Sequence, residues 1–209
     1  MKTYYIRNIF ESRSGIGIDI IPDDISEETR TFYVSQGFLK KHKLQKGQDI
    51  DEVLFSEIEE HHTLRRAIYK AADILAGGDY SVLRLKMKLT EKGFSKETAE
   101  AAALYMEERG YIREYEAAER MARFLLETKN RGKQRIIAEL SAKGYNKAAI
   151  KSAAESISEE EYYEALCRQI KMKYKTPASD RKEQEKRIAA MIRQGFKAGD
   201  VLRAMSAEK

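Results

Sequence analysis

The feature that most constrains the fold of this chain is an internal repeat of 51 residues. Three segments share one pattern: LKMKLTEKGF (85–94), IIAELSAKGY (136–145) and RIAAMIRQGF (187–196). Gly93, Gly144 and Gly195 are 51 residues apart, and each is followed by an aromatic residue. The register continues after the glycines at the helical spacing i, i+3, i+4, with Ala99, Ile150 and Val201, then Ala102, Ala153 and Ala204, then Ala103, Ala154 and Met205. A period of this length is typical of stacked helical repeats.

Each repeat is expected to contain three helices. The glycine should end the middle helix as its C′ residue in a left-handed conformation. A short turn with a capping residue, Ser95 in the first repeat and Asn146 in the second, then opens a further helix. Another helix precedes each pair, over 65–78, 114–130 and 161–175. One such unit buries little apolar surface, so neighbouring repeats must stack, and we expect an elongated array that can curve.

The first 60 residues follow a different pattern. Residues 3–11, 15–21 and 31–36 are rich in β-formers, and 36–44 and 50–62 have helical patterns. The predicted fold class is therefore mainly α: three tandem three-helix repeats with a small mixed α/β N-terminal extension. The expected parts are the extension (1–60) and the repeats at 61–112, 113–157 and 158–209.

The charge of the chain is unevenly distributed. Residues 1–60 hold 8 Lys and Arg against 12 Asp and Glu, a net charge of −4. Because the whole chain has 39 and 34, residues 61–209 hold 31 and 22, a net charge of +9. A polyanion or an acidic protein surface would be attracted to this part of the chain. A helical surface that is merely solvated and rich in lysine is the alternative.

The basic residues suggest a binding surface. One cluster lies at the entry to the middle helix of the second repeat, a second lies within the helix expected over 161–175, and a third set repeats at the 51-residue spacing. We take as candidate partner-binding residues Lys129, Arg131, Lys133, Arg135 and Lys143 from the first, Arg168 and Lys171 from the second, and Arg84, Arg135 and Lys186 from the third. Tyr162, Tyr163 and Tyr174 are interleaved with the second cluster, a mixture that could meet phosphates and stack on bases.

No pattern in the sequence indicates an enzyme. A phosphate-binding loop and a complete dinucleotide motif are both absent. His61 and His62 lack the companion ligands of a structural metal site, so we expect no metal, no cofactor and no catalytic residue.

The single Cys167 cannot form an internal disulfide, which favours a reducing compartment. No apolar stretch is long enough for a membrane helix, so we expect a cytoplasmic protein without membrane contact.

Over residues 65–157 the chain resembles the RecX family of recombination regulators. The resemblance rests on SVLRLKMKLTEKGFSKETAEAAALYMEERGYI (81–112), EYEAAERMARF (114–124) and RGKQRIIAELSAKGYNKAAIKSA (131–153). In the family pattern Ser81 opens a helix that continues as Leu-x3-Leu-x3-Gly-Phe. The chain departs from the pattern at Arg113, where an acidic residue is usual, and at Tyr145, where an aliphatic residue is usual.

The resemblance implies a partner and not a reaction. Members of the family bind the RecA filament on single-stranded DNA and reduce its ATP hydrolysis, strand exchange and growth. They thereby regulate DNA repair, homologous recombination and the SOS response. We accordingly expect a monomer that contacts single-stranded DNA through the filament. A protein that binds DNA directly through helix-turn-helix-like units is the second hypothesis, because three-helix units and a positive charge also fit it.

Overall fold

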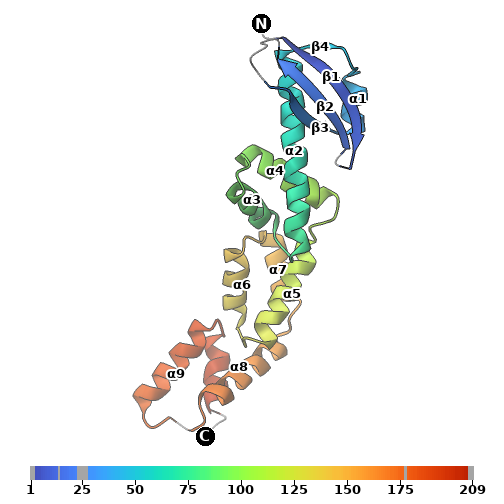
Figure 1. Ribbon diagram of the computed structural model, residues 1–209. Helices are drawn as coiled ribbons and strands as arrows, with labels where there is room; N and C mark the ends of the chain where they lie inside the picture. The colour runs from blue at the N-terminus through green and yellow to red at the C-terminus, as the bar shows by residue number, and fades with distance from the viewer. Residues whose placement is uncertain (1–2, 14, 23–27, 177, 207–209) are drawn as a thin grey trace. The chain divides into compact units, whose positions relative to one another are not determined.

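The computed structural model describes residues 3–13, 15–22, 28–176 and 178–206. By their internal contacts the residues pack as two compact units. Unit 1 comprises Met1–Gly77 and Lys86–Glu108, and unit 2 comprises Gly78–Leu85 and Arg109–Lys209. The predicted fold class is confirmed, since the described residues form mostly helices with a small antiparallel sheet in unit 1 (Figure 1). The division at residues 60, 112 and 157 stays a prediction, as does the arrangement of the repeats relative to one another.

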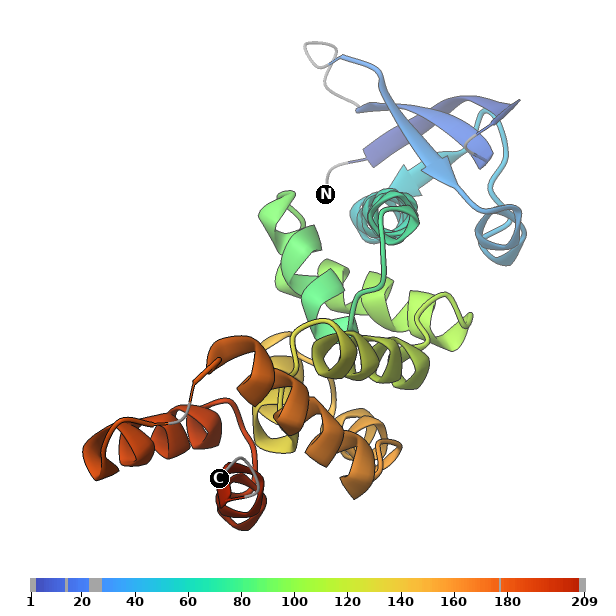
Figure 2. The same ribbon diagram turned by 90° about the horizontal axis from the view of Figure 1, so that it is seen from below.

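The sheet of unit 1 has the strand order β3-β2-β1-β4 and is antiparallel in every pair. Its strands are β1 (Thr3–Ser12), β2 (Gly15–Pro22), β3 (Arg30–Val34) and β4 (Asp49–Asp51), with the short helix α1 (Gln36–Lys41) between the last two. The sequence predicted the first three strands and missed β4. Figure 2 shows one face of the sheet packed over α2 (Glu52–Ala76). Buried Ile6, Ile18 and Val34 of the sheet and Phe55 and Ile58 of α2 form this core.

Helix α2 differs from the sequence-based expectation. Residues 50–62 and 65–78 were predicted as separate helices, and the structure has one continuous helix of 25 residues. Asp51 caps it, since its side chain accepts a hydrogen bond from Leu54 N at 2.8 Å. The sequence between the two predicted segments contains neither proline nor glycine, so nothing in it ends a helix.

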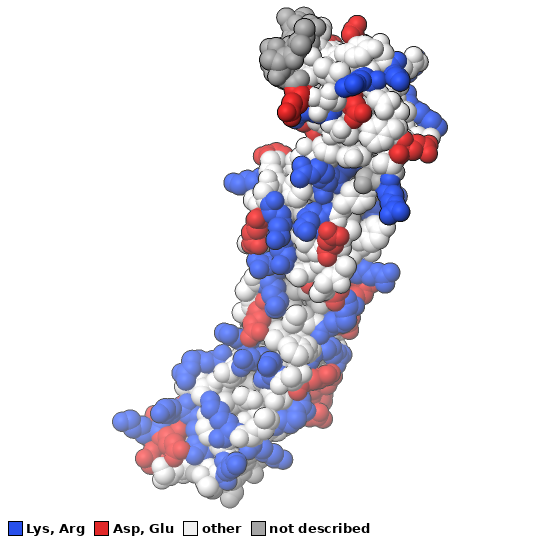
Figure 3. Space-filling model, viewed as in Figure 1, with Lys and Arg blue, Asp and Glu red and all other residues white. Residues whose placement is uncertain are grey.

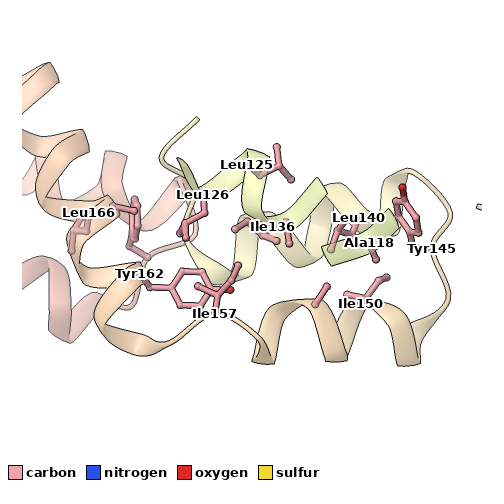
Figure 4. Packing of buried hydrophobic residues seen from close by; sticks show 14 of the residues in the cluster. Ala118, Leu125, Leu126, Ile136, Leu140, Tyr145, Ile150, Ile157, Tyr162 and Leu166 are labelled. Atoms are coloured by element: carbon pink, nitrogen blue, oxygen red, sulfur yellow. The ribbon is translucent and has the colours of Figure 1, made fainter. Parts of the chain in front are cut away.

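The three-helix units are present as predicted. The first consists of α2, α3 (Val82–Glu91) and α4 (Lys96–Glu108), and the second of α5 (Glu114–Glu127), α6 (Lys133–Ala142) and α7 (Lys147–Glu155). The third consists of α8 (Glu159–Lys173), α9 (Arg181–Arg193) and α10 (Ala198–Ser206). Figure 4 shows Leu126, Ile136 and Leu140 within the core of unit 2, which Tyr162 and Leu166 extend into α8.

The three repeated glycines end their helices with the same geometry. Gly93, Gly144 and Gly195 have φ of 91°, 79° and 92°, which confirms the left-handed prediction. Each donates a hydrogen bond to the carbonyl three residues earlier at 2.9 Å, and the following aromatic residue donates to the carbonyl five residues earlier. This pair of bonds is the Schellman motif, which satisfies carbonyls that the helix leaves unpaired.

Within unit 2, the middle helices of successive repeats meet head to tail. At the start of α3, Ser81 Oγ donates to the carbonyl of Lys143 at 3.0 Å and accepts from Arg84 N at 3.2 Å. At the start of α6, Gly132 N donates to the carbonyl of Gln194 at 2.9 Å. Ser81 and Gly132 are 51 residues apart, so the same junction occurs twice. In each case the positive end of one helix dipole meets the negative end of the next.

We predict that Gly195→Ala destabilises the protein much more than Gly93→Ala. Both substitutions place a side chain at a left-handed φ, which costs roughly 1 kcal/mol or more. At Gly93 a Cβ would meet nothing within 4 Å, whereas at Gly195 it would lie 2.2 Å from Arg135 N in the junction. Chemical denaturation of the two variants measures the difference in the free energy of unfolding. Equal losses would show that the junction does not require glycine.

Two histidines of α2 bind the edge of the sheet. His62 Nδ1 accepts from Tyr33 N at 2.9 Å, and His61 Nε2 accepts from Ser35 N at 3.2 Å. These amides belong to edge strand β3 and the residue that caps α1, so they need partners outside the sheet. Burial lowers the pKa of both histidines, and nearby Arg65 lowers that of His61 further.

We predict that the protein loses stability as the pH falls below 6.5, the ordinary pKa of histidine. In the folded protein the two imidazoles accept hydrogen bonds and must be neutral, whereas in the unfolded chain they take up protons more readily. Their contribution to the free energy of unfolding is therefore fully present above pH 6.5 and declines below that pH. Thermal unfolding at pH 7.5 and 5.5 measures the loss. The variant His61→Gln with His62→Asn keeps two acceptors that do not titrate, and it should show a smaller loss. An equal loss in that variant would assign the pH dependence to other groups.

Candidate protein and nucleic-acid interface

The repeated basic positions occupy the same place on each middle helix. Arg84 and Arg135 are the third residues of α3 and α6, and Lys186 is the sixth of α9. Each lies nine residues before the glycine that follows its helix, and all three are exposed. The next position in the chain carries Leu85 and Ile136 in the first two repeats, both fully buried. Helical geometry therefore directs the basic side chain to the surface whenever its neighbour enters the core. The two head-to-tail junctions fix the spacing of these positions in unit 2.

The three positions differ in their ion pairs. Arg135 Nε lies 2.9 Å from Glu139 Oε1, one turn along α6, and its side chain is 49% exposed. Arg84 and Lys186 form no ion pair with any residue that the structure describes. Exposed single ion pairs contribute little to stability, so all three side chains can exchange their contacts for those of a partner.

The cluster at the entry of the second repeat is divided by the structure. Arg131 contacts the side chain of Gln194 and lies 3.6 Å from Glu139, and it therefore stabilises the junction with the third repeat. Lys133 Nζ lies 3.5 Å from Glu159 Oε1 and 5.8 Å from the centre of the Tyr162 ring. Lys129 and Lys143 are exposed, with Lys129 Nζ 5.9 Å from the centre of the Phe124 ring. Arg131 and Lys133 thus already have intramolecular partners, whereas Lys129 and Lys143 are the more accessible members.

The second cluster is divided in the same way. Arg168 Nε donates to Asn130 Oδ1 at 3.1 Å and lies near Glu164. Asn130 is buried and has a φ of 46°, so this contact holds a strained loop residue in place. Lys171 is exposed and has no ion-pair partner within the described part of the chain. Figure 3 shows Lys and Arg side chains spread over the face of unit 2 that carries α9.

The tyrosines of this cluster are not available as stacking platforms, contrary to the expectation from their position in the sequence. Tyr162 is 5% exposed, its hydroxyl donates to the carbonyl of Ala154 at 3.1 Å, and burial raises its pKa to about 12. Arg203 covers the ring of Tyr163 at 4.1 Å, and Arg187 covers that of Tyr174 at 4.6 Å. The chain's own cations therefore take the positions that a base or a ligand cation would need.

Glu114 makes a buried polar contact that no sequence pattern indicated. The residue is 7% exposed, and its carboxylate accepts a hydrogen bond from Asn146 N at 2.8 Å. Asn146 in turn caps α7, because its side chain accepts from Ala149 N at 2.8 Å. An acidic residue in the first turn of an amphipathic helix is usually solvated, and only the packing of α5 against α7 reveals this role.

Other kinds of site find little support among the described residues. They contain no group of three or more His, Cys, Asp or Glu side chains that could hold a metal ion. Cys167 is partly buried against the core of unit 2. None of the described helices combines the length and the apolar character needed to cross a membrane.

Comparison with curated proteins finds relatives that share one name. A protein named "Regulatory protein RecX" from Leuconostoc mesenteroides is 25% identical over 168 residues, which are 79% of this chain and 62% of that protein. A protein of the same name from Listeria monocytogenes is 24% identical over 172 residues, 81% of this chain and 64% of that protein. The chain thus spans somewhat less than two thirds of the length of these relatives. No family model matches it.

Solved structures share the fold. A crystal structure of a regulatory protein RecX superposes with a TM-score of 0.78 and 20% identity, covering 98% of this chain and all of that one. The crystal structure of RecX from Lactobacillus salivarius gives a TM-score of 0.60 and 17% identity, over 69% of this chain and 96% of that one. The fold and the relatives define the class, a protein of tandem three-helix repeats whose named relatives are regulators. The chain is therefore similar in sequence, over about four fifths of its length, to proteins named regulatory protein RecX, and it shares its fold with solved RecX structures.

Proposed function

We propose that this protein is a regulator that binds the RecA filament on single-stranded DNA and inhibits its ATPase, strand exchange and growth. It would act in the cytoplasm, as a monomer, by occupying the filament and not by catalysis. The observation that carries the proposal is the equivalent placement of Arg84, Arg135 and Lys186 on successive repeats. A periodic row of cations suits a periodic partner, because contacts to several protomers or phosphates add through avidity.

The proposal assigns the remaining basic residues two different roles. Lys129, Lys143 and Lys171, which are exposed, would contribute electrostatic attraction around the row. Arg131, Lys133 and Arg168 would act by holding the second and third repeats together, since each has an intramolecular partner. Charge reversal in this second group would disturb the fold as well as the interface, so it makes a poor test of binding.

Direct binding to DNA is the second candidate function. The net charge of +5 and the exposed cations of unit 2 favour it as well. The covered rings of Tyr162, Tyr163 and Tyr174 count against tight binding to a bare single strand, since such proteins stack bases on accessible aromatic side chains. A direct binder should hold naked DNA at physiological salt, with an affinity that falls steeply as salt increases.

We predict that substoichiometric amounts of the protein reduce ATP hydrolysis by RecA on single-stranded DNA. The triple variant Arg84→Glu, Arg135→Glu, Lys186→Glu should need at least about tenfold more protein for half-inhibition, a loss of about 1.4 kcal/mol or more in binding. A control with the same change in charge reverses Arg7, Lys46 and Lys92, which are exposed residues of unit 1. Circular dichroism verifies that both variants keep their helices.

The outcomes separate the two candidates. Equal inhibition by the triple variant and the wild type would remove the row from the interface. No effect on RecA, together with tight and strongly salt-dependent binding to naked DNA, would favour direct DNA binding. Loss of inhibition in both variants would indicate that total charge matters and the positions do not.

A further inference from the structure

A groove of about 310 Å³ lies between α6 and α7 in unit 2. Ile137, Ile150 and Ala154 provide its apolar lining, and three lysines, Lys133, Lys147 and Lys151, line it as well. Lys147 and Lys151 are one turn apart on α7, and Lys133 belongs to the first turn of α6. Ile150 is a core residue with 7% of its surface exposed, and Ile137 is half-buried, so the accessible apolar surface of the groove comes mainly from Ile137. Apart from Lys133, whose ion pair with Glu159 joins the second and third repeats, the residues of the groove have no role in the proposed function.

The first repeat provides an internal comparison for this groove. The positions 51 residues before Ile137 and Lys151 are Lys86 and Glu100, on α3 and α4. Lys86 Nζ and Glu100 Oε2 are 2.6 Å apart, so a salt bridge joins the two helices where the second repeat has its groove. The second repeat has an aliphatic side chain at the first position and, at the second, a lysine whose ion pair, with Glu155, stays within its own helix. Both repeats have the same order of helices, and they differ here in the side chains at the two positions.

The third repeat lacks the lysines that flank the groove in the second repeat. The positions 51 residues after Ile137 and Lys151 are Ile188 and Leu202, and the position after Lys147 is Ala198. These three positions of the third repeat therefore carry apolar side chains and no lysine. Among the three repeats, the combination of an apolar lining with flanking lysines occurs in the second.

The chemistry of the groove selects its occupant. Burial of an aliphatic side chain against Ile137 and Ile150 would remove apolar surface from water. Lys147 forms no ion pair with a described residue, and Lys151 Nζ is 4.0 Å from Glu155 with its side chain 75% exposed. These ammonium groups can therefore bind carboxylates next to that side chain. A nucleic acid fits less well, since no aromatic residue lines the groove to stack a base.

We propose that the groove between α6 and α7 is a docking site for an acidic amphipathic segment of a partner protein. The segment is a short helix with aliphatic side chains along one face and Asp or Glu one turn away, the pattern by which helices bind in grooves. The apolar face contacts Ile137 and Ile150, and the carboxylates pair with Lys147 and Lys151. The docking site is separate from the row of Arg84, Arg135 and Lys186, so it stands or falls independently of the proposed function.

The test uses the full-length protein and three fluorescent probes. The first is a 12-residue acetylated and amidated peptide with leucines at i, i+4 and i+7 and glutamates at most other positions. The second replaces its leucines with serine at unchanged charge, and the third is an oligodeoxythymidine of twelve nucleotides. Fluorescence anisotropy at physiological salt measures affinity, and methyl NMR of isoleucine-labelled protein locates binding at Ile137 and Ile150. The first peptide should bind, and the serine peptide should bind at least tenfold more weakly.

The decisive variant transplants the side chains of the first repeat into the second. Ile137→Lys with Lys151→Glu recreates the pair of Lys86 and Glu100, so it closes the groove with a salt bridge that this fold already accommodates. It lowers the net charge by one, and the control Lys92→Gln does the same at an exposed site of unit 1. The transplant should weaken peptide binding at least tenfold, while the control should not.

Three results would overturn the proposal. The first is unchanged affinity in the transplant, and the second is the absence of binding by the leucine peptide. The third is tighter binding of the oligonucleotide than of the peptide, with isoleucine methyl shifts, which would make the groove a nucleic-acid site. None of these measurements includes RecA, so their failure is distinguishable from failure of the RecA assay.

Discussion

The structure of unit 2 depends on one contact, in which the start of a middle helix meets the glycine turn that ends the next one. A helix leaves amide groups unpaired at its start and carbonyls unpaired at its end, and this contact satisfies both. It also requires backbones to approach closely, since a Cβ at Gly132 would lie 2.3 Å from the carbonyl carbon of Gly195. The same contact made through Ser81 and Lys143 shows that it is a property of the repeat.

The third repeat departs from this pattern. The position equivalent to Ser81 and Gly132 is Glu183, whose carboxylate accepts from Ser179 N at 2.7 Å and pairs with Arg187 at 2.5 Å. These bonds hold the pKa of Glu183 at about 2, well below its usual range. Arg187 also replaces the aliphatic residue of the earlier repeats and covers the Tyr174 ring. The start of α9 is thus satisfied by side chains of its own segment.

The position of a cation in the sequence did not predict its role. Arg131 and Arg135 are four residues apart in the sequence, yet Arg131 contacts Gln194 in the next repeat while Arg135, on α6, is half exposed. Tyr162 looked like part of a binding surface and instead belongs to the core.

The sequence pattern did not indicate strand β4 or the continuity of α2. A three-residue strand carries almost no periodic signal, and two helical patterns in succession do not reveal whether the chain bends between them.

The sequence alone determined the repeat, the helix-ending glycines and the buried faces, because backbone conformation and helical periodicity depend on residues within a few turns of one another. Leu89, Leu140 and Met191 are all fully buried as their shared register requires. Only the tertiary structure decided which charges are accessible and which repeat has an open groove. Glu159 and Gln194 reach Lys133 and Arg131 from other helices, and Glu100 closes the groove of the first repeat from across a turn. Electrostatic partners of this kind depend on distances through space, which chain order does not specify.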